Sequence, residues 1–232
     1  MNSFLYIILG ILPSFIWLCY FLQKDVHPES NRMVLKIFLY GMIAAIPAAL
    51  IEFGLTDSIF TTFGKSILST ILYFFVGVAF IEEFLKYLVV REKVLTSAEM
   101  DEPTDVILYL IIAALGFAAL ENILYLLQFK IFQAIFLTSF RFVGAIFLHA
   151  LCSGTLGYFL ALSCYRPEKK LSLLTLGFIL ATLFHGTFNY GIIKMEINLA
   201  WILLPIFIII GLATFVSLGF IKLKKMKSVC KF

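Results

Sequence analysis

The sequence predicts an all-α membrane protein, a polytopic bundle of about seven transmembrane helices. Of its 232 residues, 62% are hydrophobic and 14% are charged, whereas an ordinary soluble domain has roughly 25% charged residues. The mean hydropathy is +1.04. Apolar runs long enough to cross a hydrocarbon core of about 30 Å recur along the whole chain. These observations exclude a soluble fold and predict a single transmembrane domain over residues 1–232.

Seven apolar runs are each long enough to span a bilayer. They cover residues 3–22, 34–54, 66–90, 105–128, 140–165, 171–193 and 199–221. A basic segment follows the first run and no positive segment precedes it, so we expect a first span and not a cleaved signal peptide. The stretch Lys130–Thr138 is also apolar. It is either an interfacial segment or an extension of the fifth helix.

Lys and Arg residues alternate between the segments that connect these runs. The successive connections carry 3, 1, 3, 2, 3, 1 and 5 of them, so 14 fall on one side and 4 on the other. Because cytoplasmic loops are enriched in Lys and Arg, we expect the N-terminus outside and the C-terminus in the cytoplasm. We therefore attribute the net charge of +4 to the Lys and Arg residues that orient the chain in the lipid bilayer. Only the short C-terminal tail is strongly basic, so no nucleic acid partner is expected.

Ionisable residues inside the predicted spans are few. An ionisable side chain in a span costs several kcal/mol unless it is paired or hydrated, so each one is a functional candidate. The candidates singled out among them are Glu52, Glu82, Glu83, Glu121, Arg141, His149 and His185. Glu52 lies near the outer end of its run, where we expect an interfacial residue.

Two adjacent carboxylates occur in the third run. Glu82 and Lys86 are four residues apart and face the same side of a helix, so they can pair. Glu83 points about a quarter-turn away. We expect Lys86 to hold one carboxylate as an ion while the other lies in a drier place, a separation that acid–base chemistry uses. The structural alternative is an ordinary helix end near the interface.

The other candidates lie on the next three runs. Glu121 is deep in the fourth run without a basic residue on its own helix face, so it needs a partner from another helix, and the candidates are His149 and His185. Ser153 and Asn189 follow these histidines by one turn, which gives each helix a polar stripe. A Cys152–His149 nucleophile is an alternative, but no third orienting group accompanies it.

Taken in order, these residues resemble the PrsW family of intramembrane proteases, part of the wider group of CAAX-type prenyl proteases and bacteriocin-processing relatives. The resemblance covers residues 82–190, which would form a catalytic core of four helices. Four motifs carry it, one on each helix. The first is Glu82-Glu83-x-x-Lys86, and the second is Asp105 followed by Gly116-Phe117 and then Glu121-Asn122-x-x-Tyr125. The third is Arg141 followed by His149 and then Gly157-Tyr158, and the fourth is His185-x-x-x-Asn189. One departure is that Val106, Leu110 and Ala114 stand where small residues, mostly Gly, are expected, which predicts looser packing or a shifted helix there.

The resemblance implies a site made of Glu82, Glu83, Glu121, His149, His185 and Asn189, with Lys86, Asn122 and Arg141 in supporting roles. Two mechanisms fit these residues. In one, Glu82 or Glu83 is the general base for a water, and His149, His185 and Asn189 hold the water or stabilise the oxyanion. In the other, His149, His185 and Glu121 bind a divalent metal such as zinc. The residues favour the metal-free version slightly, because no His-Glu-x-x-His string preorganises two ligands on one helix.

The resemblance also implies a location and a substrate. We expect a multi-pass protein of a bacterial plasma membrane that cleaves a membrane-anchored, single-span regulatory protein, such as an anti-sigma factor. Three alternatives are a CAAX-type prenyl-protein endopeptidase, a proton-coupled transporter and a membrane scaffold without enzymatic activity. A transporter would be expected to show internal repeats, which are not apparent in this sequence.

Overall fold

The computed structural model describes residues 2–25, 27–97 and 100–226, and every regular element in these ranges is a helix. Seven helical stretches are long and apolar enough to cross a membrane, which confirms the predicted fold class. The α-helices are α1 (Asn2–Leu22), α2 (Asn31–Phe63), α3 (Ile67–Ile71), α4 (Ile81–Lys93), α5 (Pro103–Leu126), α6 (Ile131–Val143), α7 (Ala145–Tyr165), α8 (Lys170–Lys194) and α9 (Leu203–Leu223). Three further helical segments are η1 (Leu72–Phe80), η2 (Pro167–Lys169) and η3 (Leu199–Ile202).

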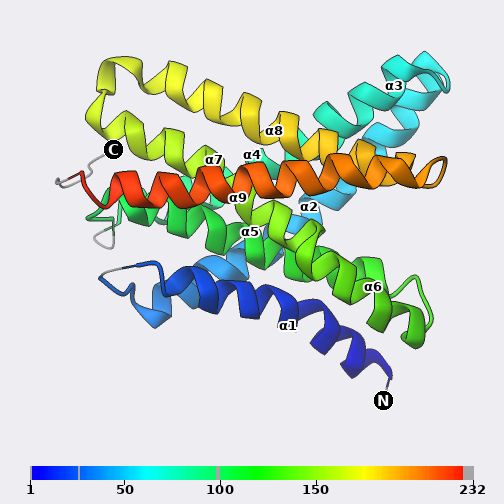
Figure 1. Cartoon of the computed structure of the whole chain (residues 1–232), viewed down its shortest axis with the longest axis horizontal. Coiled ribbons are helices and arrows are strands. Elements are labelled where there is room, and N and C mark those ends of the chain that lie inside the picture. Colours follow the sequence, from blue (N-terminus) through cyan, green and yellow to red (C-terminus); the bar gives the residue numbers. More distant parts are fainter. Residues whose placement is uncertain (1, 26, 98–99, 227–232) are drawn as a thin grey trace.

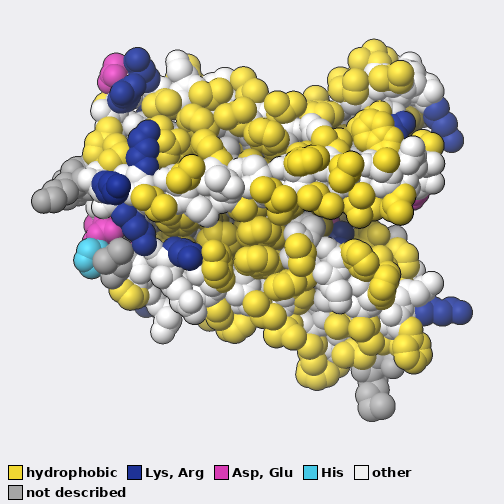
Figure 2. All heavy atoms as spheres, viewed as in Figure 1, with side chains coloured by type: hydrophobic (Ala, Val, Ile, Leu, Met, Phe, Trp, Pro, Cys, Tyr) yellow, Lys and Arg dark blue, Asp and Glu magenta, His cyan; other side chains and the backbone are white. Residues whose placement is uncertain are grey.

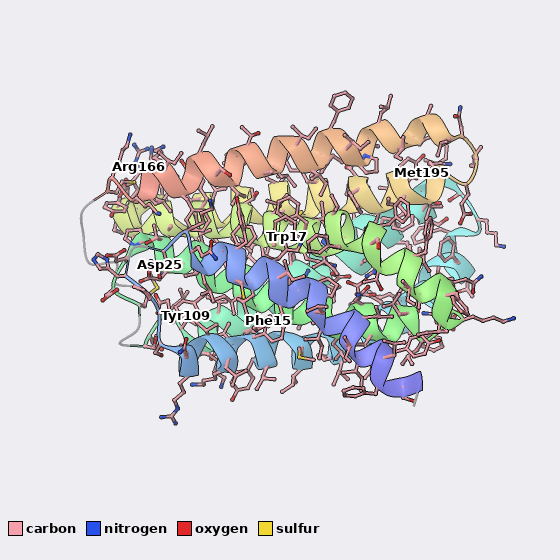
Figure 3. The ribbon with its side chains drawn as sticks, turned by 60° about the horizontal axis from the view of Figure 1, so that its bottom comes forward. Phe15, Trp17, Asp25, Tyr109, Arg166 and Met195 are labelled. Carbon is pink, nitrogen blue, oxygen red and sulfur yellow. The ribbon has the colours of Figure 1, made fainter. Side chains whose placement is uncertain are left out.

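The two ends of the chain lie toward opposite ends of the bundle (Figure 1), as an odd number of spans requires. Asp25, after α1, and Arg166, after α7, lie at one end, and Met195, after α8, lies at the other (Figure 3). Lys and Arg side chains gather mainly at the first of these ends, and hydrophobic side chains cover the middle (Figure 2). We call the end that carries Asp25 and Arg166 the basic end. The cytoplasmic location of this end stays a prediction.

Helix α5 is the centre of the bundle. In its most apolar part 83% of the residues are buried, against 22% to 39% in the other six spans. Glycines let α2 approach it closely, since a Cβ at Gly41 would lie 2.1 Å from the carbonyl oxygen of Ala113 and one at Gly116 would lie 2.0 Å from that of Phe38. The looser packing expected at the departures from the family pattern is not found. Three side chains there are fully buried: Val106, Leu110 and Ala114.

The third span is not a uniform α-helix. The segment η1 is a π-helix of nine residues that continues directly into α4, where the paired carboxylates lie. π-helical segments are rare and occur frequently at functional sites. The apolar periodicity of the sequence did not predict this change of helix type.

The fifth span bends at a glycine. Helix α6 ends at Val143, Gly144 has φ −90° and ψ −98°, and α7 begins at Ala145. Trp17 on α1 donates its indole N–H to the carbonyl oxygen of Phe142 at 2.8 Å, which supplies a donor to the backbone just before the bend, where lipid offers none. Residues 131–138 are helical and form the first part of α6, which adjoins α7. The predicted start at residue 140 was therefore about nine residues late, and the alternative of an extension of the fifth helix is the one found.

Helix α2 extends to Phe63, well beyond the predicted end at residue 54. The hydroxyls of Thr56, Ser58 and Thr61 each donate to the carbonyl oxygen four residues earlier. These bonds satisfy the hydroxyls within their own helix, so the polar residues beyond the apolar run do not end it. The helix ends at Gly64, whose φ of 61° is one that glycine adopts without strain.

Candidate active site

Lys86 lies at the centre of a buried polar cluster formed by α4, α5, α7 and α8. Its side chain is 0% exposed, and its Nζ donates to Glu83 Oε1 at 2.8 Å and to Glu82 Oε2 at 3.1 Å. The same ammonium lies 2.8 Å from His149 Nδ1 and 4.4 Å from the centroid of the Phe117 ring. The expectation that Lys86 holds one glutamate and leaves the other apart is therefore wrong. A three-residue and a four-residue spacing both bring a helix side chain within reach.

Glu83 is the fully enclosed carboxylate of the pair. It is 0% exposed, and both of its oxygens are engaged. Oε1 contacts Lys86 and also lies 3.1 Å from His185 Nδ1, while Oε2 accepts a hydrogen bond of 2.6 Å from the hydroxyl of Ser153. Because a buried carboxylate is tolerated only when it is paired and hydrogen-bonded, these contacts hold Glu83 in one position.

Only one of the two carboxylate oxygens of Glu82 is hydrogen-bonded among the described residues. Its Oε2 contacts Lys86 and lies 3.5 Å from His149 Nδ1 and 3.8 Å from His185 Nε2. Its Oε1 has no hydrogen-bond partner among the described residues. Glu82 therefore faces both histidines and keeps one oxygen available for another molecule.

The two histidine rings lie at right angles, with centroids 4.9 Å apart. Each uses one nitrogen to contact a carboxylate outside the space between them: His149 Nε2 lies 2.6 Å from Glu121 Oε2, and His185 Nδ1 lies 3.1 Å from Glu83. A histidine that donates one N–H to a carboxylate has its tautomer and ring orientation fixed. The remaining nitrogens, Nδ1 of His149 and Nε2 of His185, both point toward Glu82.

Glu121 joins the cluster at its more open side. Its side chain is 33% exposed, and Arg141 donates to its Oε1 at 2.8 Å. Arg141 also donates to the side-chain oxygen of Asn122 at 2.5 Å, and Asn122 in turn donates to the backbone oxygen of Leu9 on α1. Of the two histidines named as partners for Glu121, His149 is the one in contact.

Glu52 and Asn189 lie near this cluster but form no direct hydrogen bond with it. Glu52 is half-buried, and its carboxylate is close enough to Glu121 and Lys86 for their charges to act on it. The interfacial position of Glu52 stays a prediction. Asn189 is half-buried one turn beyond His185, and its side chain forms no hydrogen bond with the described part of the chain.

Ser153 was not among the predicted site residues, although it supplies the only hydroxyl bonded to Glu83 among the described residues. The signal that could have found it is its place one turn after His149, on the same helix face. Cys152 is buried beside it, but the ring nitrogens of His149 contact Lys86 and Glu121. The cysteine–histidine alternative gains no support from these contacts.

The formal charges of this cluster do not balance. Three carboxylates, on Glu82, Glu83 and Glu121, face two basic side chains, Lys86 and Arg141. An excess negative charge in a poorly solvated place is costly, so a proton or a bound cation is expected to balance it.

The donor atoms of Glu82, His149 and His185 lie within 4.8 Å of one another and could hold a metal ion. This group differs from the predicted one, because Glu82 takes the place of Glu121. Two histidines and one glutamate are a known zinc set, and each ring carries a carboxylate on its other nitrogen, as metal-binding histidines commonly do. The residue types therefore fit a divalent cation. Because the Lys86 ammonium contacts Glu82 Oε2 and His149 Nδ1, it would have to give up the His149 contact for that histidine to hold the ion.

The fold and this cluster define a class: polytopic helical membrane proteins that bury carboxylates, histidines and a lysine together within the span region. Comparison with known proteins identifies the family. The family model of the PrsW family intramembrane metalloproteases matches residues 29–218. The chain belongs to this family, which supports a membrane protease and a multi-pass location in a bacterial membrane.

Curated relatives named Protease PrsW cover most of the chain. The protein of Geobacillus kaustophilus is 32% identical over 188 residues, which are 81% of this chain and 79% of that protein. The protein of Bacillus subtilis is 30% identical over 222 residues, 95% of this chain and 94% of that protein. No solved structure matches the chain.

Proposed function

We propose that this protein hydrolyses a peptide bond in a membrane-anchored, single-span regulatory protein, of which an anti-sigma factor is an example. Family membership supports proteolysis in the membrane. The observation that carries the proposal is the environment of the Glu82 carboxylate. Its Oε2 is hydrogen-bonded to Lys86 and faces two oriented histidines, while its Oε1 has no hydrogen-bond partner among the described residues.

In the proposed reaction Glu82 is the general base. Its Oε1 takes a proton from a water molecule as the water oxygen bonds to the carbonyl carbon of the substrate, and the proton then passes to the leaving amine. His185 orients the water through Nε2, which faces Glu82, and His149, whose two ring nitrogens contact Lys86 and Glu121, keeps Lys86 in place beside Glu82. Asn189, one turn from His185, donates to the oxygen that becomes negatively charged.

The remaining residues position this group. Glu83, held by Lys86, His185 and Ser153, keeps the His185 ring in place. Glu121, held by Arg141, does the same for His149. Water and substrate approach from the side of Glu121, whose side chain is 33% exposed, whereas the side chains of Lys86 and Glu83 are 0% exposed.

A metal-dependent version of the same hydrolysis is the second candidate, and the ligand group Glu82, His149 and His185 favours it. A divalent cation held there would polarise the substrate carbonyl and activate a bound water. In this version Glu83 and Glu121 orient the two histidine ligands. Arg141 and Lys86 balance the charge of the carboxylates.

The experiment that tests the proposal is cleavage of a co-expressed single-span substrate by Glu82→Gln. The matched control is Glu92→Gln, the same change on the same helix, because Glu92 is exposed in a surface pair with Arg91. We expect Glu82→Gln to lose cleavage by a factor of about 10² to 10⁴ and Glu92→Gln to keep it. Undiminished cleavage by Glu82→Gln would overturn the proposal.

Elemental analysis of the purified chain separates the two versions. The metal-dependent version requires about one divalent ion per chain in the parent protein and its loss in His185→Ala. The metal-free version requires full cleavage by protein that contains no stoichiometric divalent metal.

A further inference from the structure

A groove between α1 and α9 lies outside the candidate active site. The backbones of these two helices do not pack on each other within the described residues; α7 contacts both and lies between them. Figure 1 shows α1 and α9 on either side of the intervening helices. The groove therefore opens sideways, toward the surroundings of the bundle.

The floor and walls of this groove are mostly apolar. They include Phe147 and Leu151 of α7, Phe21 of α1, and Val216 and Phe220 of α9. The ring centroids of Phe21 and Phe220 are 6.5 Å apart, so side chains of α1 and α9 approach each other in the lining of the groove. The volume is about 180 Å³, more than ten times the roughly 15 Å³ that one water needs, so the groove admits a chain of methylene groups.

Two lysines stand at the rim of the groove on the basic end. Lys24 follows the end of α1 and Lys224 follows the end of α9, and both line the groove and are exposed. Lys24 lies 4.5 Å from the centroid of the Tyr20 ring. No ion pair with another described residue neutralises either lysine, so both charges are available to a ligand.

An apolar groove with two cations at one end matches the chemistry of one class of membrane component. Basic pockets between transmembrane helices bind anionic lipid headgroups, and the rim lysines lie where α1 and α9 leave the span region. We propose that this groove binds one anionic phospholipid, with its phosphate between Lys24 and Lys224 and an acyl chain along Phe147 and Leu151. The bound lipid joins α1 to α9 at the basic end.

The test measures lipid binding to the purified full-length chain by native mass spectrometry. The probes are phosphatidylglycerol and, for comparison, zwitterionic phosphatidylcholine with the same acyl chains. The charge variant is Lys24→Gln with Lys224→Gln. The matched control is Arg166→Gln with Lys169→Gln, which removes the same charge from exposed positions on the same end but outside the groove. A third variant, Ala213→Phe, fills the groove and keeps both lysines.

We expect one tightly bound phosphatidylglycerol on the parent protein and on the control. The charge variant should bind it roughly 30-fold more weakly, the effect of two lysines near an anionic lipid. Ala213→Phe should also lose the bound lipid. Equal retention by the charge variant, an equal loss in the control, or equal binding of phosphatidylcholine by the parent would overturn the proposal.

Discussion

The two halves of helix α2 differ in how closely they approach the rest of the bundle. Toward the basic end, α2 contacts α5 so closely that a Cβ at Gly41 would lie 2.1 Å from a backbone oxygen. Further along α2, a Cβ at Gly54 would meet nothing within 4 Å. The candidate site follows the same division, since Lys86 and Glu83 are enclosed and Glu121 is partly exposed. The comparison indicates a site with a rigid, closed side that fixes the carboxylates and an open side that admits water and substrate.

The largest expected effect is on the closed side. Lys86→Met leaves Glu82 and Glu83 as buried carboxylates without their shared cation, so we expect a loss of about 3–5 kcal/mol in the free energy of unfolding. The measurement is unfolding in mixed detergent micelles. Lys93 is exposed on the same helix, and its Nζ lies 5.1 Å from the centroid of the Tyr40 ring. Lys93→Met should therefore cost no more than about 1 kcal/mol, the value of an exposed cation–π contact. Equal stability of the two variants would contradict an enclosed ion cluster.

The next effect concerns helix approach. Gly41→Ala forces a methyl group against the backbone of α5 and should destabilise the protein by about 3 kcal/mol, the upper part of the range for overpacking. Gly54→Ala, on the same helix, meets open space and should be neutral or slightly stabilising. The same unfolding measurement applies. A destabilisation by Gly54→Ala as large as that by Gly41→Ala would contradict the difference between the two halves.

Ser153→Ala should have a smaller effect. It removes the hydroxyl that donates to Glu83 Oε2, and a hydrogen bond to a charged group contributes about 1.5–3 kcal/mol. Ser163→Ala on the same helix is the control, because the Ser163 hydroxyl donates only to the carbonyl oxygen of Leu160 in its own helix. If both variants unfold at the same denaturant concentration, Glu83 does not depend on Ser153.

The smallest stability effect is expected on the open side. Arg141→Gln removes a partly exposed ion pair with Glu121, which contributes at most about 1 kcal/mol. The variant also frees Glu121 from the position that orients His149, so we expect kcat to fall by up to about 100-fold with little change in stability. Arg91→Gln, which breaks an exposed pair with Glu92, is the control for both assays. A large loss of stability without a loss of kcat would assign Arg141 a purely structural role.

Much of the fold could be predicted because a span needs a long apolar run, and that requirement is visible in one sequence. The fine structure of the spans could not. Nothing in the apolar pattern distinguishes the π-helical η1 from an α-helix. The extension of α2 contains hydroxyls that bond to the backbone of their own helix, such as that of Thr56, and hydropathy counts such residues as polar although the helix continues through them.

The sequence predicted which residues form the site better than it predicted which of them contact one another. Charged residues are so few in the spans that Glu82, Glu83, Glu121, His149 and His185 could be selected from the sequence. Which carboxylate accompanies both histidines depends on helix rotation and depth, so Glu121 was chosen for a group in which the structure has Glu82.

The division of roles between Glu82 and Glu83 is tested most directly by measuring kcat and unfolding on the same preparations of Glu82→Gln and Glu83→Gln. Glu82→Gln should remain folded with nearly parental stability and lose cleavage by at least about 10²-fold. Glu83→Gln should be destabilised by about 3 kcal/mol or more and should retain more cleavage per folded molecule than Glu82→Gln. A stable but inactive Glu83→Gln together with an active Glu82→Gln would contradict the assignment of Glu82 as the base.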